Sequence, residues 1–231
     1  MGKIVSVISG CGGVGKSTLA VCAAVTSARK GRSVILLDAS GVSRACDLML
    51  GMESIVVVDM LDVINHEAAL QNALYAVPGV SNLRYASASL YEGSTLSELS
   101  GLILALRAMC DLLIIDLPTG PARIGRELLD RNDVLLLITR PDDISVRSLE
   151  RTISAMPDLP AQRHLIVNRL NPVLVKKKIH YPAQRIEMML DIPSSCVLNE
   201  EDAAISKNKK HEIEIRSAIH SQISRLIDQI L

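Results

Sequence analysis

One segment, Gly10 to Ser17, constrains this chain more than any other. It reads glycine, four further residues and then Gly-Lys-Ser, and it lies between an apolar, β-prone run at 4–8 and an Ala- and Val-rich run at 18–30. Glycines at such a junction let backbone N–H groups turn inward and surround phosphate oxygens. The pattern predicts a phosphate-binding loop between the first strand and the first helix. The plain alternative is an ordinary Gly-rich turn.

The residues of this loop have separate expected roles. Lys16 would reach the β- and γ-phosphates of a nucleoside triphosphate, and Ser17 would offer its hydroxyl to Mg²⁺. The N-terminus of the following helix would add the positive end of its dipole. The loop residues expected to contact the nucleotide are Gly10, Cys11, Gly12, Gly13, Val14, Gly15, Lys16, Ser17 and Thr18.

Short apolar runs alternate with helical segments along the rest of the chain. Continuous apolar runs of this length are typical of strands buried on both faces of a parallel sheet. The alternation predicts an α/β fold, a doubly wound, mostly parallel sheet of about seven to eight strands flanked by helices. We expect a single domain over residues 1–231. Further strands are expected at 33–38, 83–88, 111–116, 133–139, 164–168 and 196–198, and further helices at 67–76, 95–109, 124–132, 145–155 and 212–231.

Two carboxylates, Asp38 and Asp116, stand at the ends of predicted strands. Ligands of doubly wound folds bind outside the carboxyl ends of the strands, so both side chains would lie beside the phosphate loop. Because Mg²⁺ prefers oxygen ligands, we predict a metal site made of Ser17, Asp38 and Asp116. Gly120 would bring a backbone N–H to the γ-phosphate. Lys16, Asp38 and Asp116 are the expected catalytic residues.

The composition gives no case for nucleic acid as a partner. Lys and Arg total 25, as do Asp and Glu, and the basic clusters at 176–178 and 207–211 are expected to be solvated loops. Five cysteines without paired spacing are typical of reduced thiols in a cytosolic protein. We expect neither a signal peptide nor a membrane span, and we expect the amphipathic segment 212–231 to dock on the sheet rather than on a membrane.

Several blocks of the chain, in order and spacing, resemble the MinD/ParA family of P-loop ATPases, and MinD members more than plasmid-partition members. They are Ser9 to Thr18, Asp59 to Val63 with Leu70 to Leu74, Asp116 to Gly120, Thr139 to Ser148, and Val167 to Arg169. The resemblance implies binding of ATP or ADP with Mg²⁺ and ATP-dependent dimerisation, with two nucleotides between two subunits. It also implies that Asn168 and Arg169 contact the adenine.

The chain departs from this family's pattern at two loop positions. Cys11 stands where the family has a lysine that crosses the dimer interface to the partner's phosphates, and Ser40 stands where the family has a water-orienting aspartate. A cation at the transition state accelerates phosphoryl transfer by about 10³ to 10⁵ in related enzymes. We therefore expect nucleotide binding with weak or absent hydrolysis, unless Arg123, Arg126 or Arg147 supplies the charge.

A third departure concerns location. MinD members carry an amphipathic C-terminal tail that serves as a membrane anchor, and this chain ends at Leu231 without one. We therefore expect a cytoplasmic protein for which direct membrane contact is doubtful, and which lies at the inner membrane only through a partner.

Three functions remain open at this point. The first is a nucleotide-dependent switch or scaffold that positions the division site, a pilus or a flagellum through an unidentified protein partner. The second is an ATPase that inserts metal or matures iron–sulfur centres in a partner enzyme, since Cys11 would lie near the dimer axis. The third, a small-molecule P-loop kinase, explains the phosphate loop but not the later blocks.

Overall fold

The chain folds around one eight-stranded sheet with the order β3-β4-β2-β5-β1-β6-β7-β8. The computed structural model describes residues 1–41, 44–88, 99–120, 129–156, 158–200, 204–207 and 213–231. β3 pairs with β4 antiparallel, and the other described neighbours in this sheet are parallel. The strands are β1 (Lys3–Ser9), β2 (Val34–Asp38), β3 (Tyr75–Ala76), β4 (Leu83–Ser87), β5 (Leu112–Asp116), β6 (Val134–Thr139), β7 (Gln162–Leu170), β8 (Ser194–Asn199) and, in a separate antiparallel pair, β9 (Ile205–Lys207) and β10 (Ile213–Ile215).

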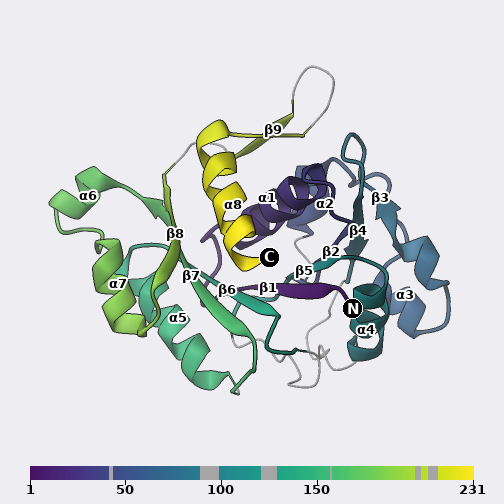
Figure 1. The fold of residues 1–231 in the computed structure, drawn as a ribbon, viewed down its shortest axis with the longest axis horizontal. Coiled ribbons are helices and arrows are strands. Elements are labelled where there is room, and N and C mark those ends of the chain that lie inside the picture. The colour runs from purple at the N-terminus through teal and green to yellow at the C-terminus, as the bar shows by residue number, and fades with distance from the viewer. Residues whose placement is uncertain (42–43, 89–98, 121–128, 157, 201–203, 208–212) are drawn as a thin grey trace.

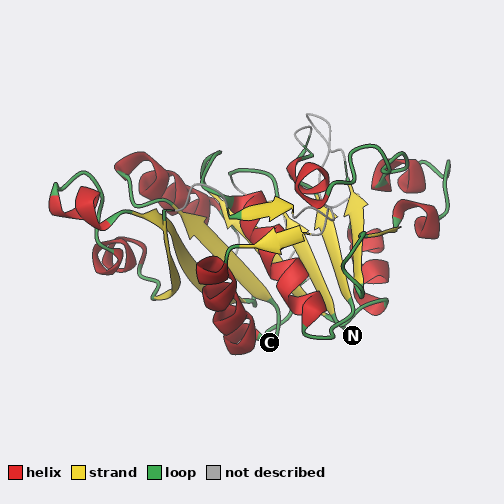
Figure 2. Cartoon of the chain, turned by 90° about the horizontal axis from the view of Figure 1, so that it is seen from above, coloured by secondary structure: helices red, strands yellow, loops and turns green. Residues whose placement is uncertain are grey.

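Helices cover both faces of the sheet (Figures 1 and 2). Successive side chains of a strand point to opposite faces. Leu112 and Ile114 of β5 accordingly join one apolar core, while Leu113 and Ile115 join the other. The helices are α1 (Lys16–Arg29), α2 (Ala45–Leu50), α3 (Met60–Ile64), α4 (Ser100–Ala108), α5 (Asp143–Ala155), α6 (Pro172–Lys176), α7 (Ala183–Leu190) and α8 (Ser217–Ile230), together with a short 3-10 helix at Leu70–Ala73. The predicted doubly wound α/β fold is confirmed.

The predicted helix at 67–76 is wrong. Asp59 accepts a hydrogen bond from the Asp62 N–H while the Asp62 side chain accepts one from the Asp59 N–H, so a capping box starts α3 earlier in the chain. Tyr75 then enters β3, and its hydroxyl accepts a hydrogen bond from the Val58 N–H at 2.7 Å. Pairing of β3 with β4 thus keeps the end of this segment extended. Of the predicted helix, only the short 3-10 helix forms.

Three other predicted helices need revision or lie partly outside the described residues. Of the segment 95–109, the described part forms α4, whereas the described part of 124–132 is a turn. The predicted terminal helix at 212–231 begins only at Ser217, because Ile213–Ile215 pairs with β9. The predicted docking on the sheet is confirmed, since α8 contacts β8 as well as α1 and Ile223 is fully buried.

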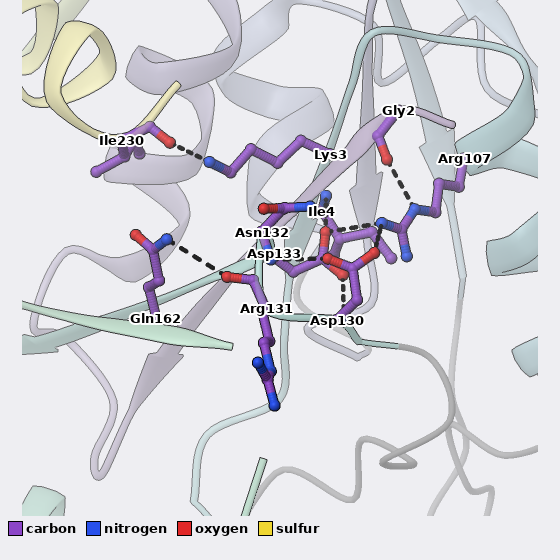
Figure 3. A network of polar contacts seen from close by, with 10 residues as sticks. All are labelled: Gly2, Lys3, Ile4, Arg107, Asp130, Arg131, Asn132, Asp133, Gln162 and Ile230. Carbon is purple, nitrogen blue, oxygen red and sulfur yellow. Dashed lines mark hydrogen bonds and ion pairs between the residues drawn. The ribbon is translucent and has the colours of Figure 1, made fainter. Parts of the chain in front are cut away.

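A polar network joins the amino-terminal ends of β1 and β6 to α4 (Figure 3). Asp133 accepts hydrogen bonds from the Ile4 N–H at 2.8 Å and from Arg107 at 3.1 Å. Arg107 also pairs with Asp130 at 2.7 Å and donates to the Gly2 carbonyl. The network lies at the edge opposite the carboxyl ends of the strands, so its role is to hold the fold together.

Candidate functional site

The glycine-rich loop lies between β1 and α1, as predicted. Gly13 and Gly15 have φ values of 75° and 96°, a left-handed conformation that favours glycine. A Cβ on Gly10 would lie 2.2 Å from the carbonyl carbon of Ser148 in α5. α1 begins at Lys16 without a side-chain cap or an acidic residue in its first turn. Its first N–H groups are therefore free of a side-chain competitor for an anion.

Lys16 lies beside a buried carboxylate. Its Nζ is 2.6 Å from Asp116 Oδ1, and the two side chains are 8% and 0% exposed. Burial raises the pKa of Asp116, and this rise is opposed by the charge of Lys16 and by hydrogen bonds from Lys16 and Ser17. Asp38 is the register partner of Asp116 across β2 and β5. Of these two buried carboxylates, only Asp116 forms an ion pair with an ammonium group among the described residues.

The residues after Asp38 turn back onto its carboxylate. Asp38 Oδ1 accepts hydrogen bonds from the Ser40 N–H at 3.0 Å and from the Ser40 hydroxyl at 2.6 Å, while Oδ2 accepts one from the Cys46 N–H at 3.2 Å. The Ser40 hydroxyl is thus engaged as a donor to Asp38.

Cys11 is half-buried and turns toward α5. Its Sγ lies 3.6 Å from the hydroxyl of Ser145, which in turn donates to Asp142 Oδ2 at 3.0 Å. Of the alternative cations, Arg147 is exposed and paired with Asp143 at 3.4 Å. Arg123 and Arg126 lie outside the described residues.

Asn168, Arg169 and Gly120 also lie at this edge of the sheet. Asn168 Nδ2 donates to the Val14 carbonyl at 2.7 Å and would be 2.4 Å from a Cβ on Gly15. Its side chain therefore packs against the phosphate loop and holds it by a hydrogen bond. The Gly120 N–H donates to the Ser9 carbonyl at 2.9 Å. Its predicted contact with the γ-phosphate therefore requires that hydrogen bond to break.

Two adjoining cavities open at the carboxyl edge of the sheet. The larger, of about 430 Å³, is lined by Ser9, Cys11, Gly12, Gly13, Gly15, Lys16, Ser17, Thr18, Ser40, Ala45, Leu48, Met49, Thr119 and Arg169. The smaller, of about 250 Å³, shares Gly15, Thr18, Met49 and Arg169 with it. Sequence reasoning missed the apolar lining of the smaller cavity, including Leu19, Leu198 and Ile223. The sequence feature that could have indicated this lining is the position of Leu198 near the end of a strand, because ligands of this fold bind outside the carboxyl ends of the strands.

The loop fits a magnesium nucleotide. Its glycines are required by close contacts and left-handed backbone, the start of α1 is uncapped, and buried carboxylates exceed the ammonium groups that pair with them among the described residues. A divalent cation would balance that excess charge. The roles assigned to Ser17, Asp38 and Asp116 at the metal, and to the other loop residues at the nucleotide, stay predictions.

The chain is similar in sequence to a known family of nucleotide-binding proteins. The ParA family model, described as an NUBPL iron-transfer P-loop NTPase, matches residues 1–181. The chain belongs to the ParA family of P-loop NTPases. Within it, the MinD of Helicobacter pylori, a septum site-determining protein, is 30% identical over 96% of this chain and 87% of its own. The MinD of Escherichia coli is 28% identical over 92% of this chain and 83% of its own.

Solved structures of ParA-family members share the fold. The MinD cell division protein of Aquifex aeolicus has a TM-score of 0.80 and 23% identity, covering 99% of this chain and 96% of its own. The MinD of Pyrococcus horikoshii, solved with Mg-ADP, has a TM-score of 0.76 and 20% identity, covering 100% and 96%. A further Aquifex structure is a MinC:MinD complex, with a TM-score of 0.79 and 21% identity, covering 99% and 95%. At these identities the likeness establishes the fold.

Proposed function

We propose that this ParA-family protein is a MinD-like positioning switch that binds ATP or ADP with Mg²⁺ and hydrolyses ATP weakly. The observation that carries the proposal is the uncapped start of α1 behind a left-handed glycine loop, with Lys16 held at Asp116 beside Asp38. The septum site-determining function named for relatives such as the Helicobacter pylori MinD supports the positioning role.

The proposed binding mode assigns each group one task. Backbone N–H groups from Gly12 to Thr18 surround the phosphates, and the Lys16 ammonium leaves Asp116 to reach the β- and γ-phosphates. Ser17, Asp38 and Asp116 hold Mg²⁺, directly or through water. When bound, the metal neutralises charge on the phosphate oxygens. The smaller cavity beside Arg169 receives the base, and its apolar lining suits a purine face.

Weak hydrolysis follows from two side chains. Cys11 carries no charge that could compensate a transferring phosphoryl group, and its Sγ is turned toward Ser145. Ser40 donates its hydroxyl to Asp38, which takes away its capacity to orient a water molecule as a carboxylate would. The loss of such groups costs several orders of magnitude in rate in related enzymes.

The proposed output is binding to another protein. We infer a nucleotide-dependent homodimer formed across the phosphate-loop edge, and an unidentified protein partner, as the MinC:MinD complex of Aquifex aeolicus illustrates for a relative. We also infer that the chain acts as one domain in the cytoplasm, with any membrane contact made through the partner. The described residues contain no helix with both the length and the apolar character needed to cross a bilayer.

The test is ATP turnover measured together with size-exclusion light scattering. We compare the natural protein with a double variant, Cys11→Lys with Ser40→Asp, and with Ser81→Asp, an exposed control near the opposite edge. We expect ATP binding with little turnover in the natural protein and in the control, and a rise of at least about tenfold in the double variant. Turnover at a family-like rate that the double variant does not raise would refute the weak-hydrolysis proposal.

One observation favours a second function. The matching family model is described as an iron-transfer NTPase, which is consistent with a metal-inserting ATPase. That function predicts iron with acid-labile sulfide in anaerobically purified protein, bound at a dimer axis near Cys11. Absence of both iron and sulfide from such protein excludes it and leaves the positioning switch.

A further inference from the structure

A buried thiol lies beside the two carboxylates, Asp38 and Asp116, at the carboxyl edge of the sheet. Cys46, in the first turn of α2, is fully buried, and its Sγ lies 3.5 Å from Asp116 Oδ2. Its polar neighbours are Asp116 and Asp38, the latter also bound by the Cys46 N–H. One ligand atom from each residue lies within 4.8 Å of the other two. The three side chains come from the ends of β2 and β5 and from α2, so only the folded chain brings them together.

The separation of these atoms suits a small tetrahedral metal ion. With Zn–S near 2.3 Å and Zn–O near 2.0–2.2 Å, tetrahedral geometry sets the sulfur and an oxygen about 3.5 Å apart. Cys46 Sγ and Asp116 Oδ2 have this separation already. A modest inward movement of Asp38 would complete a set of three protein ligands. The larger cavity lies beside the cluster, since its wall includes Ser40, which donates to Asp38, and Ala45, which precedes Cys46 in the chain.

The negative charge of the three side chains also favours binding of a divalent cation. Asp38 and Asp116 are 2% and 0% exposed, and among the described residues only Lys16 forms an ion pair with either of them. With Cys46 as a thiolate the three ligands carry three negative charges, which one ammonium group and one divalent ion neutralise. Uncompensated buried charge is costly, and a bound ion removes that cost.

We propose that Asp38, Cys46 and Asp116 form a binding site for a borderline-soft divalent metal ion such as Zn²⁺ in the nucleotide-free protein. On binding, the Cys46 thiol releases its proton to solvent and its sulfur becomes a ligand. Mg²⁺ is a hard ion that gains nothing from a thiolate, so this site goes beyond the proposed magnesium nucleotide complex. Because the two uses share Asp38 and Asp116, the soft metal and the magnesium nucleotide exclude one another.

The test is a titration of nucleotide-free, reduced protein with Co²⁺, a spectroscopic substitute for Zn²⁺. We expect the near-ultraviolet thiolate-to-cobalt charge-transfer band to saturate at one ion per chain and to disappear when one equivalent of Zn²⁺ is added. Cys46→Ser should abolish the band, while Cys196→Ser, which changes another buried cysteine on β8, should leave it unchanged. Cys46→Ala removes the thiol without placing a hydroxyl in the core. It replaces the serine variant in this test if Cys46→Ser fails to fold, and it should abolish the band in the same way.

Three results would overturn the site. They are the absence of a charge-transfer band in the natural protein, a band that survives in both Cys46 variants, and a band that is lost in Cys11→Ser but not in the Cys46 variants. The experiment contains no nucleotide, so it fails or succeeds independently of the proposed function. Calorimetric titration with Mg-ADP, with and without one equivalent of Zn²⁺, then tests the exclusion, and equal nucleotide affinity in both would contradict a shared site.

Discussion

At the residue scale, Asp133 and Asp130 share Arg107 but differ in burial. Asp133 is fully buried and Asp130 is half exposed, while Arg107 is largely buried. Asp133 also accepts hydrogen bonds from the Ile4 and Asp130 N–H groups, and hydrogen bonds to a buried charged group contribute about 1.5–3 kcal/mol each, whereas an exposed pair contributes about 1 kcal/mol or less. We expect Asp133→Asn to lower the free energy of unfolding by about 3 kcal/mol, and Asp130→Asn by about 1 kcal/mol or less. Urea denaturation measures both, and equal losses would contradict this ranking.

His164 gives the fold a dependence on pH. Its Nδ1 lies 2.8 Å from the Ser195 hydroxyl, and burial, aided by the charge of Lys3, lowers its pKa below 6.5. The unfolded chain therefore takes up a proton more readily, so this residue's contribution to stability is present above about pH 6.5 and is lost as the pH falls through the folded-state pKa. The melting temperature of the natural protein should fall more than that of His164→Gln between about pH 7.5 and pH 5. Parallel profiles would show that His164 has no such role.

At the element scale, α8 attaches to the rest of the molecule through one apolar face. Ile223 is fully buried in the core that also contains α1, and Lys30, the C-cap residue of α1, pairs with Asp228 at 2.6 Å. Truncation of a buried isoleucine costs about 2–5 kcal/mol. Ile223→Ala should lower the free energy of unfolding by about 3 kcal/mol, whereas Arg225→Ala on the exposed face should change it by less than about 0.5 kcal/mol. A loss of less than about 1 kcal/mol for Ile223→Ala would mean that α8 is loosely attached.

The elements also show what local sequence can and cannot predict. β2, β5 and β6 are continuous aliphatic runs buried on both faces, so their pattern alone predicts a parallel sheet. The start of α8 was misjudged because Ile215 lies four residues before Ile219 and so fits a helical period, whereas in the structure it pairs with Ile205 of β9. Lys16 and Asp116 were predicted as site residues from a motif and a strand end. Cys46 was not, because its contact with Asp116 joins positions 70 residues apart.

At the scale of the whole molecule, the two edges of the sheet have different tasks. The Arg107 and Asp133 network holds the amino-terminal edge, while the loop, the buried carboxylates and both cavities lie at the carboxyl edge. The carboxyl edge holds two buried carboxylates, Asp38 and Asp116, of which only Asp116 has an ion-pair partner among the described residues, and buried charge without a partner is destabilising. Ligand binding should therefore stabilise the whole chain.

This coupling gives a prediction for the melting temperature. A ligand at about 100 times its dissociation constant adds about 2.7 kcal/mol, which corresponds to about 5–10 °C for a chain of this size. We expect Mg-ADP to raise the melting temperature of the natural protein by this amount. Lys16→Ala should lose most of the shift, because the phosphates lose their principal cation, whereas Lys177→Ala, an exposed lysine outside both cavities, should keep it. Since each variant is compared with its own ligand-free form, any destabilisation by the substitution itself cancels. An equal shift in Lys16→Ala would mean that the nucleotide binds away from the phosphate loop.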